Sequence, residues 1–84
     1  MTVLITGAAG NAGQAVSRLI AGAGFPVRLA DVAHPSPDVA VLGEFVRCDT
    51  RTPTDVQRAV AGADAVVHLA AWHSAHRPPV SDAQ

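Results

Sequence analysis

Short apolar runs, separated by polar and glycine-rich stretches, recur along this 84-residue chain. Residues 3–5 form the first run and show no alternation of apolar and polar positions, which is typical of a central strand covered on both faces. Further strand candidates lie at residues 27–31 and 44–49, where charged residues interrupt the apolar ones, and at 65–69, which is apolar except for His68. We therefore predict four strands, each too short to be a helix.

Between the first two runs, apolar residues recur at the spacing of one helix face. They predict a helix from about Asn11 to Ala21, which Gly22 and Gly24 would end. The expected apolar stripe of this helix comprises Ala12, Ala15, Val16, Leu19 and Ile20. After the second strand, prolines at 35 and 37 predict a loop with a helix shortened or missing between Asp38 and Leu42.

A further helix start is visible in the sequence Thr52-Pro53-Thr54-Asp55. Thr52 suits the N-cap, Pro53 the first helical position, and Asp55 is placed to reach back as in a capping box. The apolar face of this helix would comprise Val56, Ala59 and Val60. Strands that alternate with helices in this way predict an α/β fold with a parallel sheet.

Glycines at 7, 10 and 13 follow the first predicted strand and open the first predicted helix. Gly7 would allow the tight turn, Gly10 would leave room for a pyrophosphate to approach the backbone, and Gly13 would let the helix pack closely. The N–H groups at the helix start, around Asn11 and Ala12, and the positive end of the helix dipole would then face an anion. A plain strand-to-helix turn would use the same glycines, so the spacing alone leaves that alternative open.

Asp31 ends the second predicted strand, about 20 residues beyond the glycines, as a dinucleotide site requires. A carboxylate there can accept hydrogen bonds from both ribose hydroxyls and would repel a 2′-phosphate. No arginine or lysine stands at positions 8, 9 or 32 to offset that repulsion. We therefore predict that NAD is the cofactor and that NADP is less favoured; a solvated carboxylate at a strand end is the alternative.

Composition narrows the class of protein. Hydrophobic residues make up 49% of the chain and aromatic residues 4%, so the core would consist of small side chains. A formal net charge of -1 gives no electrostatic footprint for nucleic acid or an anionic membrane surface. The one cysteine, Cys48, is expected to pack rather than react. No apolar run approaches the ~20 residues that span a bilayer, and no signal sequence is recognised. We expect a cytoplasmic protein.

The chain carries Thr6-Gly7-Ala8-Ala9-Gly10-Asn11-Ala12-Gly13 and then, in order, Asp31, Asp49 and His68-Leu69-Ala70-Ala71. These motifs resemble the extended short-chain dehydrogenase/reductase family, the NAD-dependent epimerase/dehydratase group. The resemblance covers nearly the whole chain, but it implies only the amino-terminal part of a Rossmann-type domain several times this length. The implied sheet is partial, with about four strands in the order 3-2-1-4 and flanking helices, and the cleft lies between strands one and four.

The resemblance also implies roles for residues near the strand ends. Asp49 and Thr50 match the position where a carboxylate meets the adenine amino group, although Asp-Thr before Arg-Thr-Pro is also ordinary turn chemistry. Leu69 to Ala71 would line the cleft near the nicotinamide ribose. The predicted cofactor-binding residues are therefore Gly7, Gly10, Asn11, Ala12, Gly13, Asp31, Asp49, Thr50, Leu69, Ala70 and Ala71.

The histidines are weaker candidates for chemistry. His68 is expected to be a packed, hydrogen-bonded core residue rather than a ligand or base. His73 and His76 have a spacing that zinc sites use, but no cysteine or carboxylate stands close in sequence, so no metal site is predicted. Residues 1–76 are expected to form the NAD(P)-binding half-domain, and residues 77–84 an irregular tail.

Catalytic residues are not predicted anywhere in the chain. The family acts through a Tyr-x-x-x-Lys pair, whereas this sequence has no tyrosine and its six basic residues are all arginine. We therefore interpret the chain as the NAD-binding amino-terminal part of an NAD-dependent epimerase/dehydratase or sugar-type dehydrogenase that is not catalytic alone. The alternatives are a non-catalytic NAD-binding module and a non-functional remnant. A second copy or a complementing chain would cover the exposed edge of a four-stranded sheet.

Overall fold

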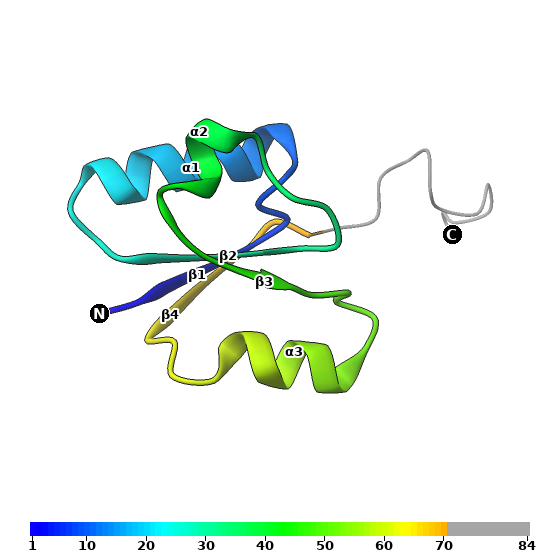
Figure 1. Cartoon of the computed structure of the whole chain (residues 1–84). Helices are drawn as coiled ribbons and strands as arrows, with labels where there is room; N and C mark the ends of the chain where they lie inside the picture. The colour runs from blue at the N-terminus through cyan, green and yellow to red at the C-terminus, as the bar shows by residue number, and fades with distance from the viewer. Residues whose placement is uncertain (71–84) are drawn as a thin grey trace, which may run out of the picture.

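The computed structural model describes residues 1–70, in which one sheet lies between two helical layers (Figure 1). The elements in chain order are β1 (Val3–Thr6), α1 (Asn11–Gly22), β2 (Val27–Asp31), α2 (Pro37–Ala40), β3 (Gly43–Arg47), α3 (Pro53–Val60) and β4 (Ala65–His68). The strands pair in parallel in the order β3-β2-β1-β4. This arrangement confirms the predicted partial Rossmann-type α/β sheet. The expected tail at 77–84 lies outside the described residues.

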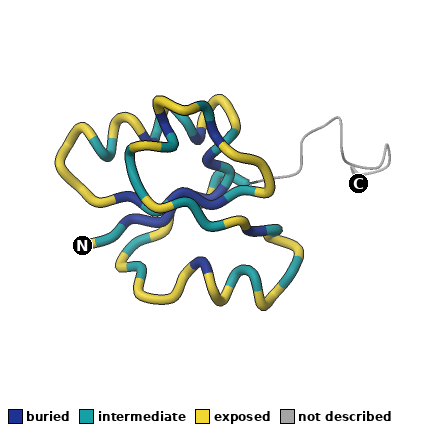
Figure 2. Tube along the Cα trace, in the orientation of Figure 1, coloured by how far each residue is buried: buried dark blue, intermediate teal, exposed yellow. Residues whose placement is uncertain are grey.

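The two layers are unequal. Helices α1 and α2 cover one face of the sheet, and α3 covers the other (Figure 1). The buried side chains on the α1 side include Val3, Ile5 and Leu29, and those on the α3 side are Leu4, Ala30, Cys48 and Ala59. Figure 2 shows this burial concentrated in the central strands, as expected for a sheet that is covered on both faces.

Helix α1 packs on the sheet through a face that coincides only in part with the predicted apolar stripe. Its buried residues are Gly13 and Ser17. Of the predicted stripe, Ile20 packs against the core and Val16 is half-buried, whereas Ala12, Ala15 and Leu19 are exposed. The prediction was wrong for these three because it counted only apolar residues. Small residues one turn apart let the helix backbone come close to the sheet, and the buried Ser17 hydroxyl is satisfied by donating to the Gly13 carbonyl at 2.7 Å.

Helix α3 begins at Pro53 after Thr52, as predicted, but the expected capping box does not form. The Asp55 carboxylate accepts instead from the N–H of Asp49 at 3.0 Å, which ties the helix start to the end of β3. At the other end, Arg28 of β2 donates to the carbonyls of Ala59 and Ala61 at 2.7 and 2.6 Å. A cation from the sheet therefore satisfies carbonyls that the helix leaves unpaired.

Strand β4 is an edge strand of the described sheet, and its burial alternates along the chain. Ala65 and Val67 pack against the core on the α1 side, while Val66 on the other face is 51% exposed. The sequence had suggested a strand covered on both faces. The difference arises because α3 packs against residues of β1, β2 and β3 and leaves its side of β4 bare.

No helix within residues 1–70 is long and apolar enough to cross a membrane. The longest, α1, has 12 residues, against the roughly 20 that a bilayer core requires.

The close approach of α1 to the preceding turn gives a test of the fold. A Cβ atom at Gly13 would lie 1.9 Å from the Gly7 carbonyl oxygen, so Gly13→Ala forces backbone atoms apart. We expect it to lower the free energy of unfolding by about 1–3 kcal/mol or more. Gly22→Ala is the matched control, because nothing lies within 4 Å of its Cβ position. Denaturant unfolding should show the control unchanged or stabilised by up to about 1 kcal/mol; equal effects in both variants would contradict this packing.

Candidate functional site

The turn between β1 and α1 lies at the carboxyl end of the central strand. Gly7 adopts a φ of 73°, a left-handed conformation that favours glycine. Two hydrogen bonds hold the turn. The N–H of Ala8 donates to the Ala30 carbonyl of β2 at 3.2 Å, and within the turn the N–H of Gly10 donates to the Gly7 carbonyl at 3.1 Å. The predicted tasks of Gly7 and Gly13 in turn geometry and close packing are therefore confirmed.

The amino-terminal end of α1 is uncapped by side chains. Gly10 occupies the N-cap, where it offers no side-chain acceptor, and the first turn carries no acidic residue. The first helical hydrogen bond runs from the N–H of Gln14 to the Gly10 carbonyl, and within residues 1–70 the N–H groups of Asn11, Ala12 and Gly13 have no acceptor. Unpaired N–H groups and the positive dipole end make this a place for an anion.

Asp31 lies beside that helix end. Its Oδ2 atom accepts a hydrogen bond from the N–H of Ala9 at 2.9 Å, and its Oδ1 atom accepts from the N–H of Val32 at 2.7 Å. An ionised carboxylate has about four acceptor positions, so about two remain for other donors. The structure thus brings the predicted ribose carboxylate to the predicted phosphate turn, although the two are 22 residues apart.

Thr6 connects the glycine turn to the end of β4. Its hydroxyl oxygen accepts from the N–H groups of Leu69 and Ala70 at 3.1 and 3.3 Å, and it lies 2.7 Å from Nδ1 of His68. A Cβ atom at Gly7 would lie 2.8 Å from the Ala70 nitrogen. Leu69 and Ala70 therefore border the glycine turn, and their predicted place in the cleft near the nicotinamide ribose stays a prediction. Ala71 lies outside the described residues.

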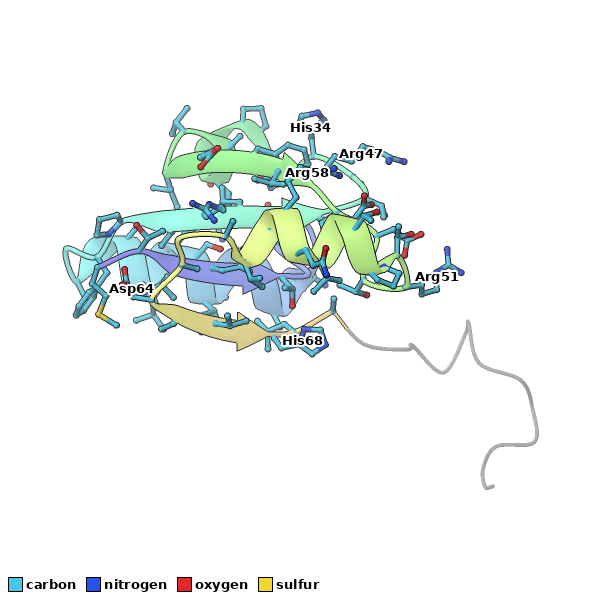
Figure 3. All side chains as sticks on the ribbon, turned by 90° about the horizontal axis from the view of Figure 1, so that it is seen from below. His34, Arg47, Arg51, Arg58, Asp64 and His68 are labelled. Carbon is cyan, nitrogen blue, oxygen red and sulfur yellow. The ribbon has the colours of Figure 1, made fainter. Side chains whose placement is uncertain are left out.

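His68 is hydrogen-bonded as predicted, but it is exposed rather than part of the core (Figure 3). It lies on the face of β4 that α3 leaves bare. Two N–H donors occupy the lone pairs of the Thr6 hydroxyl, so its hydrogen is left to point at Nδ1.

Asp49 and Thr50 lie between β3 and α3, and within residues 1–70 no hydrogen bond joins them to the glycine turn. The Asp49 carboxylate accepts three hydrogen bonds from Arg51, from its backbone N–H, Nε and Nη2, at 2.9, 3.1 and 3.0 Å. These contacts lower the pKa of Asp49 to about 2. Because about one acceptor position of the carboxylate remains, a contact with the adenine amino group stays a prediction.

The sequence patterns missed three side chains at this edge. Gln14 of α1 donates from Nε2 to the Ala9 carbonyl at 3.2 Å, and nothing in the hydrophobic periodicity signals that contact. Arg47 is paired with Asp31 in the register of β2 and β3, so the two side chains share a face. Arg47 is not one of the positions 8, 9 and 32 at which a cation next to Asp31 was expected, so the sequence pattern did not indicate it. Thr6 could have been recognised as a lone polar residue at the end of a buried apolar strand.

A groove of about 160 Å³ lies on the α3 face and is too small for a dinucleotide. Its lining residues are Leu4, Thr6, Cys48, Thr50, Val56, Ala59, Val60, Val66 and His68. Burial raises the pKa of the Cys48 thiol, which accords with a packing role. Within residues 1–70 no three histidine, cysteine, aspartate or glutamate side chains are grouped to hold a metal ion, and His73 and His76 lie outside this range.

A parallel sheet with a glycine turn, an uncapped helix end and a strand-end carboxylate defines a Rossmann-type domain of the class that carries dinucleotides at this edge. Residues 3–83 match the NAD dependent epimerase/dehydratase family, and the chain belongs to that family.

Two similar curated proteins are uronate dehydrogenases of Pseudomonas. The chain is 30% identical over 74 residues to the enzyme of Pseudomonas putida, covering 88% of the chain and 28% of the relative. It is 34% identical over 67 residues to that of Pseudomonas syringae pv. tomato, covering 80% of the chain and 24% of the relative. The chain thus spans about a quarter of the length of these relatives.

Solved structures from Agrobacterium tumefaciens share the fold. A short-chain dehydrogenase/reductase superfamily protein with bound NAD superposes with a TM-score of 0.76 at 31% identity, over 88% of this chain and 21% of that one. Uronate dehydrogenase superposes with a TM-score of 0.70 at 37% identity, over 81% of this chain and 25% of that one, and so does a mutant of it complexed with NAD.

The Thr6 hydroxyl gives a prediction for the site. Thr6→Val keeps the shape but removes the hydroxyl that accepts from Leu69 and Ala70, so we expect a loss of about 1–3 kcal/mol in the free energy of unfolding. Hydrogen exchange at the Ala70 amide should accelerate, whereas the Leu69 amide keeps the Thr6 carbonyl as an acceptor at 3.2 Å. Thr6→Ser keeps the hydroxyl and should retain most of the protection. Unchanged exchange at the Ala70 amide in the valine variant would rule out this role.

A second prediction concerns the Asp49 carboxylate. Its pKa of about 2 lies below the ordinary value of 3.8, so its share of stability is present above about pH 4 and is lost as the pH falls towards 2. Arg51→Gln should raise this pKa towards 3.8, as followed by NMR titration of the carboxyl carbon. Arg58→Gln is the control, since Arg58 pairs with Asp55 instead. A pKa that stays near 2 in Arg51→Gln would refute the assigned cause.

Proposed function

We propose that this chain binds NAD at the carboxyl edge of its sheet, as the NAD-binding amino-terminal part of an NAD-dependent oxidoreductase. The observation that carries the proposal is the pairing of an uncapped helix end with a strand-end carboxylate. The N–H groups of Asn11 and Ala12 offer donors to a pyrophosphate, and Asp31 offers acceptors to a ribose through the same turn.

The glycine turn leaves room at Gly10 for a diphosphate to approach the backbone. A Cβ atom at Gly10 would meet only the Gly7 carbonyl, at 3.4 Å, so the fold itself leaves room there. The absence of a side chain at Gly10 therefore matters most for a ligand that approaches the backbone. When bound, NAD supplies the acceptor for a hydride. The residues of this chain hold the adenosine and pyrophosphate parts and aim the remainder at Leu69 and Ala70.

Cofactor choice depends on the balance of charge around Asp31. Its carboxylate repels a 2′-phosphate and has acceptor positions left for ribose hydroxyls. Arg47, its neighbour in the sheet register, is an exposed cation that partly offsets the repulsion. We propose NAD as the preferred cofactor because the carboxylate is next to the turn, whereas the exposed guanidinium is screened by water.

The substrate class follows from the relatives. We propose that the whole protein oxidises a carbohydrate substrate of the uronate type, because both curated relatives described above are uronate dehydrogenases. The 84 residues contain no tyrosine and no lysine. The proton-transferring residues and the substrate pocket would therefore be supplied outside this chain. A cytoplasmic location remains part of the proposal.

A second candidate is a non-catalytic NAD-binding module completed by another chain. The observation that favours it is the bare face of β4, where Val66 is 51% exposed above the apolar groove. A second copy or a complementing chain that packed there would bury this surface and cover the strand edge. Measuring the molar mass in solution with and without NAD distinguishes a self-associating module from a monomer.

Titration calorimetry on the 84-residue chain tests the leading proposal. NAD should bind better than NADP by about 5-fold to 150-fold, because Asp31 contributes ribose contacts and charge repulsion. Gly10→Val should abolish the binding of both cofactors, since its side chain would occupy the approach of the diphosphate.

Gly10→Ala is the control for the size of the added side chain, and the midpoint of thermal unfolding shows whether each variant is folded. The room at Gly10 predicts that both variants fold, and that alanine weakens NAD binding less than valine. Arg47→Gln should weaken NADP more than NAD. Undiminished NAD affinity in folded Gly10→Val, or tighter binding of NADP than NAD, would count against this assignment of the edge.

A further inference from the structure

Gln14 makes contacts that neither the glycine spacing nor the proposed cofactor site requires. It is a partly buried residue in the first turn of α1. Its Nε2 atom donates to the Ala9 carbonyl at 3.2 Å, and its Oε1 atom accepts from the backbone N–H of Ser36 at 3.1 Å. The Ser36 hydroxyl, which has one hydrogen, lies within donating distance of both this oxygen and the Asp38 carboxylate. One side-chain amide thus joins the glycine turn to the segment that follows β2.

Ala9 is held on both sides by these side chains. Its N–H donates to Asp31 at 2.9 Å, and its carbonyl accepts from Gln14. The two groups belong to consecutive peptide units that lead into Gly10 and the open end of α1. Gln14 and Asp31 together therefore fix how this part of the turn faces a ligand.

The Ser36 end of the bridge fixes a second segment. Residues 32–36 leave β2 at Asp31 and reach the N-cap of α2 at Ser36, so Gln14 anchors the far end of the segment whose near end carries the ribose carboxylate. Within that segment, the His34 ring stacks on Phe45 with centroids 4.2 Å apart. A ligand that touched both Asp31 and the end of α1 would lie against the two segments that Gln14 joins.

We propose that Gln14 is a positioning residue of the NAD site, which holds the glycine turn and the segment after Asp31 at the separation that the adenosine and pyrophosphate parts require. This inference rests on the proposed NAD-binding function. Arg18 provides a contrast one turn further along α1. It joins α1 to α2 by donating to Asp38 at 2.6 Å. Within residues 1–70 it makes no hydrogen bond to the glycine turn.

The contrast defines the experiment. Gln14→Met keeps the length of the side chain and removes its hydrogen bonds, and Arg18→Met removes the neighbouring link. Calorimetry with the 84-residue chain should show NAD and ADP weakened by the same factor in Gln14→Met, roughly 5- to 20-fold, which is the worth of one or two net hydrogen bonds. Arg18→Met should stay within about 2-fold of the wild type, as expected for an exposed pair.

Hydrogen exchange provides a readout that a general loss of stability would not reproduce. In Gln14→Met the Ser36 amide should exchange faster, because it loses its acceptor, while the Leu4 amide in β1 keeps its protection. If Leu4 also loses protection, Gln14→Glu is used instead. That variant keeps an acceptor for Ser36 and loses the donor to Ala9, but its carboxylate also repels a pyrophosphate. The affinity for adenosine, which carries no phosphate, should therefore fall together with that for NAD while Ser36 stays protected; a loss for NAD alone would reflect charge repulsion and overturn the positioning role.

The outcomes separate the two proposals. Wild-type NAD affinity in Gln14→Met, or in Gln14→Glu where that variant replaces it, overturns the positioning role and leaves the NAD site intact. An equal loss in Gln14→Met and Arg18→Met overturns it as well, because any link between α1 and α2 would then suffice. If the wild-type chain binds neither NAD nor ADP, both proposals fail together.

Discussion

The close contact between the first turn of α1 and the turn after β1 is the constraint on which the rest of the structure depends. The space that a Cβ atom at Gly13 would need is filled by the Gly7 carbonyl, and Gly7 in turn lies against the backbone of Leu69 and Ala70. No side chain fits between these three backbone segments. The helix therefore starts directly at the edge of the sheet, with its unpaired N–H groups beside the ends of β1, β2 and β4.

The polar side chains at this edge hold the backbone in place. Thr6 accepts from the end of β4, Asp31 accepts from the glycine turn, and Gln14 spans the turn and the segment after β2. Asp31 can serve both purposes, since a carboxylate that accepts two backbone N–H groups still has positions for ribose hydroxyls. The site is thus shaped in advance, which lowers the ordering cost when a ligand binds.

The two faces of the sheet differ in a way that bears on what the chain can do alone. The α1 side has a continuous core, whereas the α3 side stops short of β4 and leaves Val66 and His68 exposed. The relatives are about four times longer than the matched region. The incomplete face accords with the proposal that this chain binds the cofactor and that the residues for the chemistry are supplied outside it.

The sequence by itself determined the strands, their order, the span of α1 and the tasks of Gly7 and Gly13, because apolar runs, glycine spacing and right-handed crossovers are local or topological constraints. It did not determine which face of α1 packs, so Leu19 was wrongly expected inside. Nor did it show that the Asp55 carboxylate would accept from the Asp49 N–H instead of closing a capping box, or that Arg47 would pair with Asp31 in the register of the sheet. The exposure of His68 and the bridge made by Gln14 were equally hidden. Each of these depends on how segments distant in sequence approach one another, which only the packed tertiary structure decides.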